Sequence, residues 1–358
     1  NNDNFCINGI IGDDLQPHPH YQEFQKVYQP FSFKLLNKDP IILEITNRNL
    51  RLDDIDFDFS YLLMEDGLVT QEKALPALTC PATGKIRVQV DDVVYNKSSE
   101  TFITFRFALK EDCEWAEKGH IIAWEQFNLG SPAEKQVSLS PSGEIRLHEG
   151  TDHYSITGNH FTVIIDKSTG LLLKFEMDGR EIITDAVRFN FWRALTDNDW
   201  GWKVDGKMGV WKKESGNFTL EHIEIDSLDN RKITLTSHYL FNGTSSTGEV
   251  SHTFYPDGKI TFDIHLEIPD DAPNVPRIGM QIGMNKNLDE LEWYGRGPHE
   301  NYADRKTSAA VGIYRSNLLN WITPYVRPQE NGNRCDVRWI KFSSKDGFNC
   351  EFTAGSHR

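Results

Sequence analysis

Alternation of apolar and polar residues with a period of two dominates this 358-residue chain and restricts it to folds that are rich in β-strands. The clearest stretch is 260–268, where five aliphatic or aromatic residues alternate with Thr, Asp, His and Glu. Successive side chains of a strand point to opposite faces, so this pattern predicts a strand with one apolar and one polar face. A sheet that is covered on one face only is implied.

The same pattern recurs along the chain. Residues 57–63 and 103–109 alternate in this way and predict two half-buried strands. Residues 161–165 and 171–177 flank the turn sequence Asp-Lys-Ser-Thr-Gly and predict a hairpin. Helical spacing predicts one short amphipathic helix over 21–28 and almost no other. Many short strands about ten residues apart favour β-sandwiches in series.

Composition excludes several classes of protein. Hydrophobic residues make up 38% of the chain and charged residues 25%, which is enough apolar material for packed cores and excludes a mainly disordered chain. The net charge of −15 repels phosphate backbones and anionic headgroups, so neither nucleic acid nor a membrane surface is an expected partner. The chain contains no run of about 18 apolar residues, so we expect no membrane span.

The five cysteines are far apart and include no C-x-x-C pair. We therefore expect free thiols rather than a zinc site or a disulfide framework. The stretch 130–135 lacks apolar periodicity and lies between two strand-rich blocks, which predicts a domain linker there.

The sequence contains no established catalytic motif. Carboxylates are plentiful, but the sequence singles out no pair, and no histidine has a metal-ligand partner at helical spacing. The chain has no Gly-rich phosphate loop, no G-x-S-x-G and no H-E-x-x-H. These residues alone indicate an acidic protein built of β-sandwiches.

Two segments, 193–202 and 293–305, are unusually dense in acids, amides, arginine and aromatic residues. Flat aromatic faces beside groups that form bidentate hydrogen bonds suit sugar recognition. A buried polar network that fixes a long loop would need the same residue types. The pattern leaves both interpretations open.

Both segments resemble motifs of the large β-galactosidases of glycoside hydrolase family 2. The family stretch R-A-x-x-D-N-D-x-G is matched by Arg193, Ala194, Asp197, Asn198, Asp199 and Gly201. The family stretch G-P-x-E-N-Y-x-D-R is matched by Gly297, Pro298, Glu300, Asn301, Tyr302, Asp304 and Arg305. Further matches to the family lie within 119–124 and 325–332.

The resemblance implies a mainly β fold in three parts. Residues 1–28 would be a remnant of the catalytic (β/α)8 barrel at its C-terminal end. Residues 29–133 would form an immunoglobulin-like β-sandwich. Residues 134–358 would form a large galactose-mutarotase-like β super-sandwich that is incomplete at its C-terminus.

The resemblance also implies a site. Phe5 and Asn8 would hold Na⁺ or K⁺ beside the sugar, and the parent enzyme would also use Mg²⁺. The substrate cleft would include these two residues together with Arg193, Asp197, Asn198, Asp199 and Gly201. We expect the segment 193–201 to be a loop that faces the cleft, with Gly201 allowing it to change conformation.

In the family, the general acid and the nucleophile are glutamates upstream of the residues that match Phe5, so we expect no catalytic residue in this chain. By resemblance it is the C-terminal part of a retaining β-galactosidase that hydrolyses terminal non-reducing β-D-galactose residues. It would be inactive alone and would serve as scaffold, subunit contact and cleft wall, with the remainder of its own chain, a β-galactoside and a homo-oligomer as partners.

Two alternatives come from other classes: a non-catalytic carbohydrate-binding module and, ranked last, an aldose 1-epimerase. The epimerase needs an acid paired with a histidine, and no such pair stands out in the sequence. The cellular compartment stays open between the cytoplasm and the periplasm.

Overall fold

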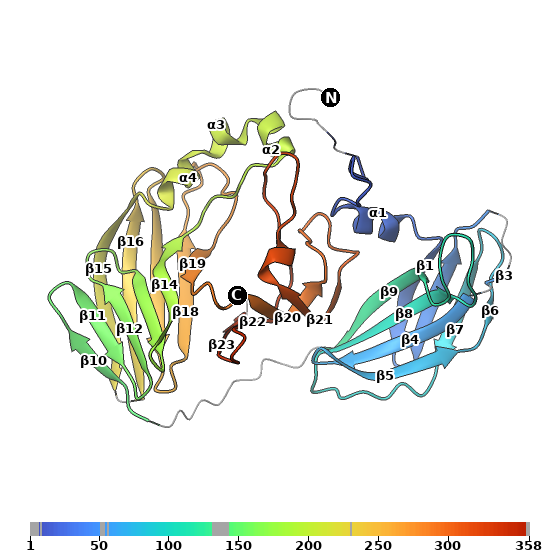
Figure 1. Cartoon of the computed structure of the whole chain (residues 1–358), viewed down its shortest axis with the longest axis horizontal. Coiled ribbons are helices and arrows are strands. Elements are labelled where there is room, and N and C mark those ends of the chain that lie inside the picture. The colour runs from blue at the N-terminus through green and yellow to red at the C-terminus, as the bar shows by residue number, and fades with distance from the viewer. Residues whose placement is uncertain are drawn as a thin grey trace.

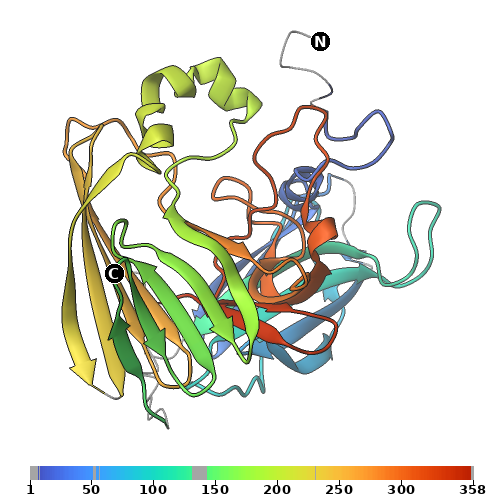
Figure 2. The same ribbon diagram turned by 60° about the vertical axis from the view of Figure 1, so that its left-hand side comes forward.

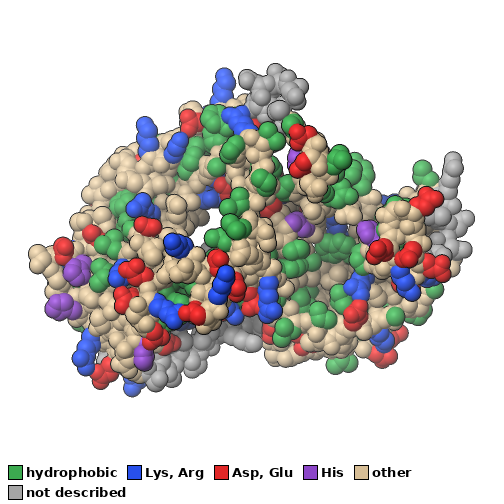
Figure 3. Space-filling view, in the orientation of Figure 1, with side chains coloured by type: hydrophobic (Ala, Val, Ile, Leu, Met, Phe, Trp, Pro, Cys, Tyr) green, Lys and Arg blue, Asp and Glu red, His purple; other side chains and the backbone are tan. Residues whose placement is uncertain are grey.

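The computed structural model describes residues 7, 9–50, 54–55, 57–130, 143–229 and 231–355. In this part of the chain antiparallel β-sheets make up most of the structure, as the alternation predicts (Figure 1). Acidic, basic and hydrophobic side chains are mixed over the face seen in this view (Figure 3). None of its helices combines the length and the apolar character needed to cross a membrane. Its four cysteines, Cys80, Cys113, Cys335 and Cys350, are free thiols, of which Cys80 is buried and Cys113 is exposed.

The predicted N-terminal helix is confirmed as α1 (Tyr21–Val27). Lys26 extends from α1 to the first sandwich, where its Nζ lies 3.0 Å from Glu125 Oε2 and 3.9 Å from the centre of the Trp124 ring. On the other side, Glu23 accepts a 2.9 Å hydrogen bond from the backbone N–H of Ser308. The helix therefore links the first sandwich to a distant C-terminal segment. The barrel origin expected for 1–28 stays a prediction.

The first sandwich has seven main strands in two antiparallel sheets with the orders β1-β2-β7 and β5-β4-β8-β9. A short pair, β3 and β6, lies beside them. This arrangement of three strands facing four is that of an immunoglobulin-like sandwich. The strands are β1 (Phe31–Lys38), β2 (Ile41–Asn47), β3 (Asp54–Ile55), β4 (Phe57–Glu65), β5 (Leu68–Leu75), β6 (Leu78–Thr79), β7 (Lys85–Val90), β8 (Thr101–Leu109) and β9 (Ile121–Gly130).

Alternation explains the core of this sandwich. In β4 the residues Phe59, Tyr61 and Leu63 are buried, and in β8 Phe105 and Phe107 are buried with none of their surface exposed. The rings of Phe59 and Phe107 lie 4.9 Å apart, which joins the two strands across the sheet. Both strands predicted from the alternation are confirmed.

A second sandwich pairs a six-stranded sheet, β10-β11-β12-β13-β14-β19, with a four-stranded sheet, β15-β16-β17-β18 (Figures 1 and 2). One apolar cluster, which includes Val163, Phe175 and Leu235, fills the space between them. The strands are β10 (Arg146–Glu149), β11 (His153–Thr157), β12 (Phe161–Asp166), β13 (Leu172–Met177), β14 (Arg180–Phe189), β15 (Phe218–Asp229), β16 (Lys232–Phe241), β17 (Ser246–Phe254), β18 (Ile260–Glu267) and β19 (Met280–Met284).

The predicted hairpin is confirmed as β12 and β13. Its turn ends at Gly170, whose φ is +69°, and a Cβ at that position would lie 2.5 Å from Tyr239 Oη. Glycine is required here both by the left-handed backbone and by the close approach of β16. The strand predicted at 260–268 is also confirmed, as β18, although Ile264 on its apolar face is 40% exposed because β18 is an edge strand.

A third sheet, β21-β20-β22-β23, packs against the first sandwich. Tyr294 and Val311 contact Met64 and Phe102 in one apolar cluster. The third sheet is made of β20 (Glu290–Gly297), β21 (Ala310–Asn317), β22 (Trp339–Ser343) and β23 (Asn349–Thr353), with the 3₁₀ helix η1 (Leu318–Trp321) after β21.

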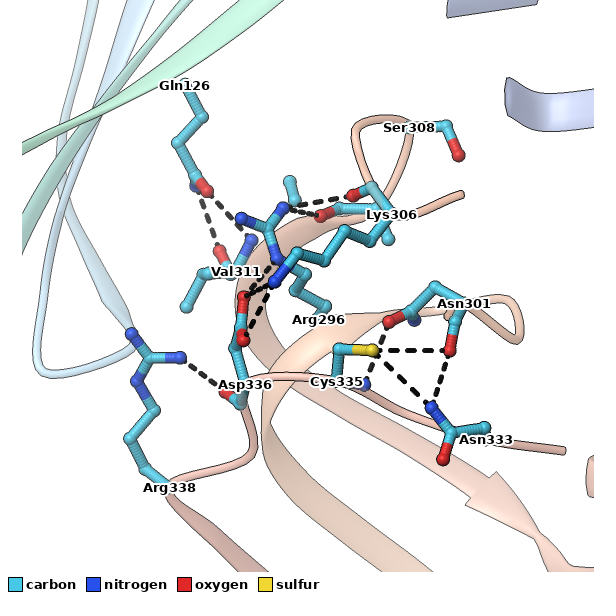
Figure 4. Close-up of polar contacts among 12 residues, drawn as sticks. Gln126, Arg296, Asn301, Lys306, Ser308, Val311, Asn333, Cys335, Asp336 and Arg338 are labelled. Carbon is cyan, nitrogen blue, oxygen red and sulfur yellow. Dashed lines mark hydrogen bonds and ion pairs between the residues drawn. The ribbon is translucent and has the colours of Figure 1, made fainter. Parts of the chain in front are cut away.

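Polar contacts fix the same interface (Figure 4). Gln126 on β9 donates a 2.9 Å hydrogen bond to Val311 O and accepts one of 2.8 Å from Val311 N, as a neighbouring strand would. Glu100 accepts hydrogen bonds from Tyr294 Oη at 2.6 Å and from Arg338 Nη2 at 2.6 Å. Burial, assisted by the Glu100 carboxylate, raises the pKa of the Tyr294 phenol. The third sheet is thus held to the first sandwich by several paired polar groups. The predicted linker falls almost wholly within 131–142, outside the described residues.

Three short helices cap one end of the second sandwich: α2 (Asp197–Trp202), α3 (Val204–Met208) and α4 (Val210–Glu214) (Figure 1). The expectation of almost no helix beyond 21–28 was therefore wrong. Each of the three has only five or six residues, too few for an apolar stripe to repeat, so helical periodicity could not reveal them.

Candidate functional site

One cleft brings together the two dense segments of the sequence. It has a volume of about 490 Å³ and receives side chains from four stretches that are far apart in the chain. The lining residues are Ile7, His18, His20, Arg193, Thr196, Asp197, Asn198, Asp199, Tyr302, Asp304, Arg305, Tyr325, Val326, Arg327, Gln329 and Glu330. Four of the five expected residues in the 193–201 segment, all except Gly201, line this cleft.

The first segment is ordered by a helix start. Thr196 is the N-cap of α2: its Oγ1 accepts a hydrogen bond from Asp199 N, and Asp199 Oδ2 accepts one of 2.9 Å from Thr196 N. This reciprocal pair is a capping box. The other oxygen of Asp199 accepts a 2.9 Å hydrogen bond from Arg193 Nη2. Asp199 and Arg193 therefore position the segment, and Asp199 is only 8% exposed.

The remaining residues of this segment face the cleft or solvent. Asp197 lies 3.7 Å from Arg327 Nη1 across the cleft, and the Arg327 guanidinium lies 5.1 Å from the Trp200 ring centre. Asn198 is exposed and lines the cleft. Gly201 lies inside α2 without a left-handed backbone, so the expected loop is partly helical and its conformation does not require glycine. The capping box is the physical reason for that difference.

The second segment is organised by the buried carboxylate of Glu300. It accepts hydrogen bonds from Arg305 Nη2, from Tyr325 Oη at 2.8 Å, from Thr323 Oγ1 at 3.0 Å and from Gly332 N at 2.8 Å. Burial opposes its ionisation, but these donors outweigh burial and lower the pKa of Glu300. A general acid needs a raised pKa, so the shift is opposite to that role.

Asn301 extends the same network. Its Oδ1 accepts a 2.8 Å hydrogen bond from Cys335 N, and its Nδ2 donates one of 2.9 Å to His299 O. Figure 4 shows Asn301 beside Asn333 and Cys335, which come from the strand-connecting segment before β22. The second segment thus combines both interpretations: Glu300 and Asn301 form a buried polar network, whereas Tyr302, Asp304 and Arg305 line the cleft.

Two histidines join the cleft from the N-terminal stretch. His18 Nδ1 and His20 Nε2 lie 2.6 and 3.1 Å from the carbonyl oxygen of Gly9, and each donates a hydrogen bond to it. Burial lowers the pKa of His20, which favours its neutral form. Sequence reasoning missed these two cleft residues because they flank a proline without any motif spacing; only the fold brings them to 193–199.

The expected cation ligands Phe5 and Asn8 lie outside the described residues, so Na⁺ or K⁺ binding there stays a prediction. Ile7, between them in the sequence, lines the cleft. The expectation of Mg²⁺ names no residue of this chain and also stays a prediction.

Comparisons with known proteins give the cleft a context. A family model described as "Beta galactosidase small chain" matches residues 157–358, and one described as "Beta-galactosidase, domain 4" matches 43–130. The first match includes the segments 193–202 and 293–305.

Whole-chain relatives agree with these matches. The chain is 31% identical over 350 residues to a protein named beta-galactosidase from Priestia megaterium, with 97% of this chain and 34% of the relative covered. It is 29% identical to a beta-galactosidase from Lactobacillus delbrueckii subsp. bulgaricus, with 98% and 34% covered. The chain therefore spans about a third of the length of these relatives. Because a single family model matches more than half of its residues, the chain belongs to the β-galactosidase small chain family.

Proposed function

We propose that this chain forms one wall of the substrate cleft of a retaining β-galactosidase that releases terminal β-D-galactose. The observation that carries the proposal is the convergence of 193–199, 302–305 and 325–330 on one cleft with the histidines of the N-terminal stretch. Relatives named beta-galactosidase that match nearly the whole chain support the same assignment.

The chemistry of the cleft suits a sugar. Exposed Asp304 and Asn198 line the cleft and offer hydrogen-bonding groups to hydroxyls. Next to the cleft, the 47% exposed Trp200 packs against the lining residue Arg327 and has a flat apolar face. The Tyr302 hydroxyl is buried and finds no hydrogen-bond partner within the described residues. Glu300 holds the 323–332 segment in place and so keeps Tyr325 and Arg327 at the cleft.

Hydrolysis with retention needs two carboxyl groups about 5–5.5 Å apart, one as acid and one as nucleophile. We assign neither to this chain; the proposal places both in the part of the enzyme that the chain does not span. The role of this chain is then to orient the galactoside and to support that part. It would also contribute to subunit contacts and, through Phe5 and Asn8, to the site of Na⁺ or K⁺.

Replacement of Asp304 tests the proposal in the full-length enzyme. Asp304→Asn removes the charge of an exposed cleft carboxylate that is not part of the Glu300 network, so we expect kcat/KM for a chromogenic β-galactoside to fall about tenfold, roughly the loss of one hydrogen bond to the substrate. The matched control is Asp346→Asn, an exposed acid that pairs with Arg180 away from the cleft and should leave kcat/KM unchanged. If both variants were as active as the parent, the proposal that this cleft contacts the substrate would be contradicted.

A carbohydrate-binding module remains the second candidate, because residues of this chain alone already form a cleft with exposed polar side chains. Calorimetric titration of the isolated chain with galactose, with glucose as control, separates the two functions. If the chain is only one part of the substrate cleft, the isolated chain should bind neither sugar at millimolar concentration. Selective binding of galactose by the chain alone would favour the module.

A further inference from the structure

A row of histidines and glutamates crosses the outer face of the four-stranded sheet β15-β16-β17-β18. The strand register places His222 opposite His238, His238 opposite Glu249, and Glu249 opposite His265. Glu224 lies two residues after His222 on β15 and therefore shares its face. These residues are separate from the cleft, and the proposed function does not use them.

Three members of the row are close enough to share an ion. His222, Glu224 and His238 each offer one ligand atom, and the three atoms lie within 4.8 Å of one another. His222 Nε2 is 3.2 Å from Glu224 Oε1, and the rings of the two histidines are stacked with centroids 4.3 Å apart. Two strands of the sheet thus present imidazole nitrogens to the same carboxylate.

One ring nitrogen of His238, Nε2, has no hydrogen-bond partner within the described residues. Its Nδ1 lies 3.3 Å from Glu249 Oε1, and because a carboxylate only accepts, this contact favours the tautomer with the proton on Nδ1. The lone pair is then on Nε2, which is buried and has no hydrogen-bond partner within the described residues. Its nearest charged neighbour is Glu224 Oε2 at 3.9 Å, a second acceptor. Two facing acceptors are stabilised by a cation between them.

The arrangement is the one that metal-binding histidines show. A ligating imidazole usually directs its other N–H to a carboxylate, which fixes the tautomer and orients the ring. Two imidazoles and one carboxylate suit Zn²⁺, whereas Mg²⁺ and Ca²⁺ prefer oxygen ligands alone. We propose that His222, Glu224 and His238 bind one zinc ion on this sheet, with Glu249 orienting His238 and water completing a tetrahedral site.

Binding of one ion requires side-chain rotation, because the rings of His222 and His238 are stacked and must turn for both nitrogens to face the metal. Zinc ligands lie at about 2.0–2.2 Å from the metal, so the three atoms must close toward one another from their present separations. His222 and Glu224 are 52% and 54% exposed, which leaves them free to turn, while His238 is held at 20% exposure beside Glu249. The bound ion links β15 to β16 and replaces the unfavourable approach of two acceptors.

The experiment is a zinc titration of the 358-residue chain after treatment with a chelator. Calorimetry should give one Zn²⁺ per chain with a Kd in the micromolar range or tighter, and Mg²⁺ should not compete. Co²⁺ in place of Zn²⁺ should give the visible absorption of a four-coordinate ion. Zinc at a hundredfold excess over Kd should also raise Tm.

Variants locate the ion. His222→Ala, at an exposed position, should weaken zinc binding at least tenfold without loss of fold, and His238→Gln should abolish it. Glu249→Gln should weaken binding about tenfold to a hundredfold, as the loss of an orienting carboxylate does. The matched control is His265→Ala, on the same face but outside the three-residue cluster, which should bind zinc as the parent does.

The proposal is overturned if the chain takes up no stoichiometric zinc at 100 μM. It is equally overturned if His222→Ala and His238→Gln bind as tightly as the parent, or if His265→Ala loses as much affinity as His222→Ala.

Discussion

Two glutamates in this chain have opposite surroundings. Glu300, beneath the cleft, receives hydrogen bonds from a guanidinium, two hydroxyls and a backbone N–H. Glu224, on the outer face of β15, faces two imidazoles: His222 Nε2 at 3.2 Å, and His238 Nε2 at 3.9 Å, which has no hydrogen-bond partner within the described residues. A carboxylate whose oxygens are satisfied by several donors is part of the scaffold, whereas a carboxylate beside an imidazole nitrogen without a hydrogen-bond partner is a candidate ligand for a cation. The hydrogen-bond partners of a carboxylate therefore indicate whether it is structural or available for binding, whatever sequence motif contains it.

Replacement of Glu300 should have the largest effect on stability. Glu300→Gln removes the charge that pairs with Arg305 in a side chain only 3% exposed, so we expect the free energy of unfolding to fall by about 3 kcal/mol in urea titrations. The control is Glu292→Gln on β20, whose partners Arg315 and Lys341 are more exposed, with an expected loss of about 0.5 kcal/mol. Equal losses in both variants would contradict the scaffold role of Glu300.

The pH dependence of this loss sharpens the assignment. The pKa of Glu300 is lowered on folding, so its contribution is fully present above the ordinary pKa of 4.5 and is lost as the pH falls through the folded value. The difference in unfolding free energy between the parent and Glu300→Gln should therefore shrink below pH 4.5.

His252 differs from both glutamates because it is buried inside the second sandwich, the one whose outer face carries His238. It lies on β17, is 2% exposed, and its Nδ1 finds no hydrogen-bond partner within the described residues. Burial lowers the pKa of His252 to about 4. Between that value and 6.5 the unfolded chain binds the additional proton, so stability falls as the pH decreases through this window.

His252→Phe removes this proton uptake and keeps an aromatic ring next to Phe262. Relative to the variant, the parent should lose up to about 3 kcal/mol of unfolding free energy between pH 6.5 and 4, and the difference should be constant above pH 6.5. Unfolding curves at each pH measure it. The same substitution at the exposed His148 is the control; a matching pH dependence there would show that burial is not the cause.

The smallest effect concerns the helix start at the cleft. Thr196→Ala removes the side-chain oxygen that caps α2, so we expect about 1 kcal/mol less local stability, or about fivefold faster hydrogen exchange at the backbone N–H of Trp200. Thr196→Ser retains the hydroxyl and should exchange at the parent rate. Unchanged exchange in Thr196→Ala would show that Arg193 and Asp199 hold the segment without the cap.

The fold was largely predictable because its elements are local. Alternation alone located β4, β8, β18 and the β12–β13 hairpin, and helical spacing located α1. Helical spacing could not locate α2, α3 and α4, because each of these helices is shorter than two turns. The motifs 193–201 and 297–305 identified the family by resemblance, and the family matches bear that out.

The site was predictable only in part. The sequence motifs include four acids, Asp197, Asp199, Glu300 and Asp304. The sequence alone could not show which of these acids are structural and which are available to a ligand. Tertiary structure separated them: Asp199 and Glu300 are enclosed by donors, while Asp304 is exposed to the cleft. A side chain's role depends on the groups that surround it, and those groups come from distant parts of the chain.

The sequence by itself determined the β-rich architecture and the family, because strand alternation and motif spacing are properties of neighbouring residues. Only the tertiary structure decided which residues meet. His18 reaches the segment 193–199 through the packing of distant segments of the chain, and His222 meets His238 through strand register. Such pairs leave no local periodicity, since chain folding, and not sequence separation, sets the distance between their side chains.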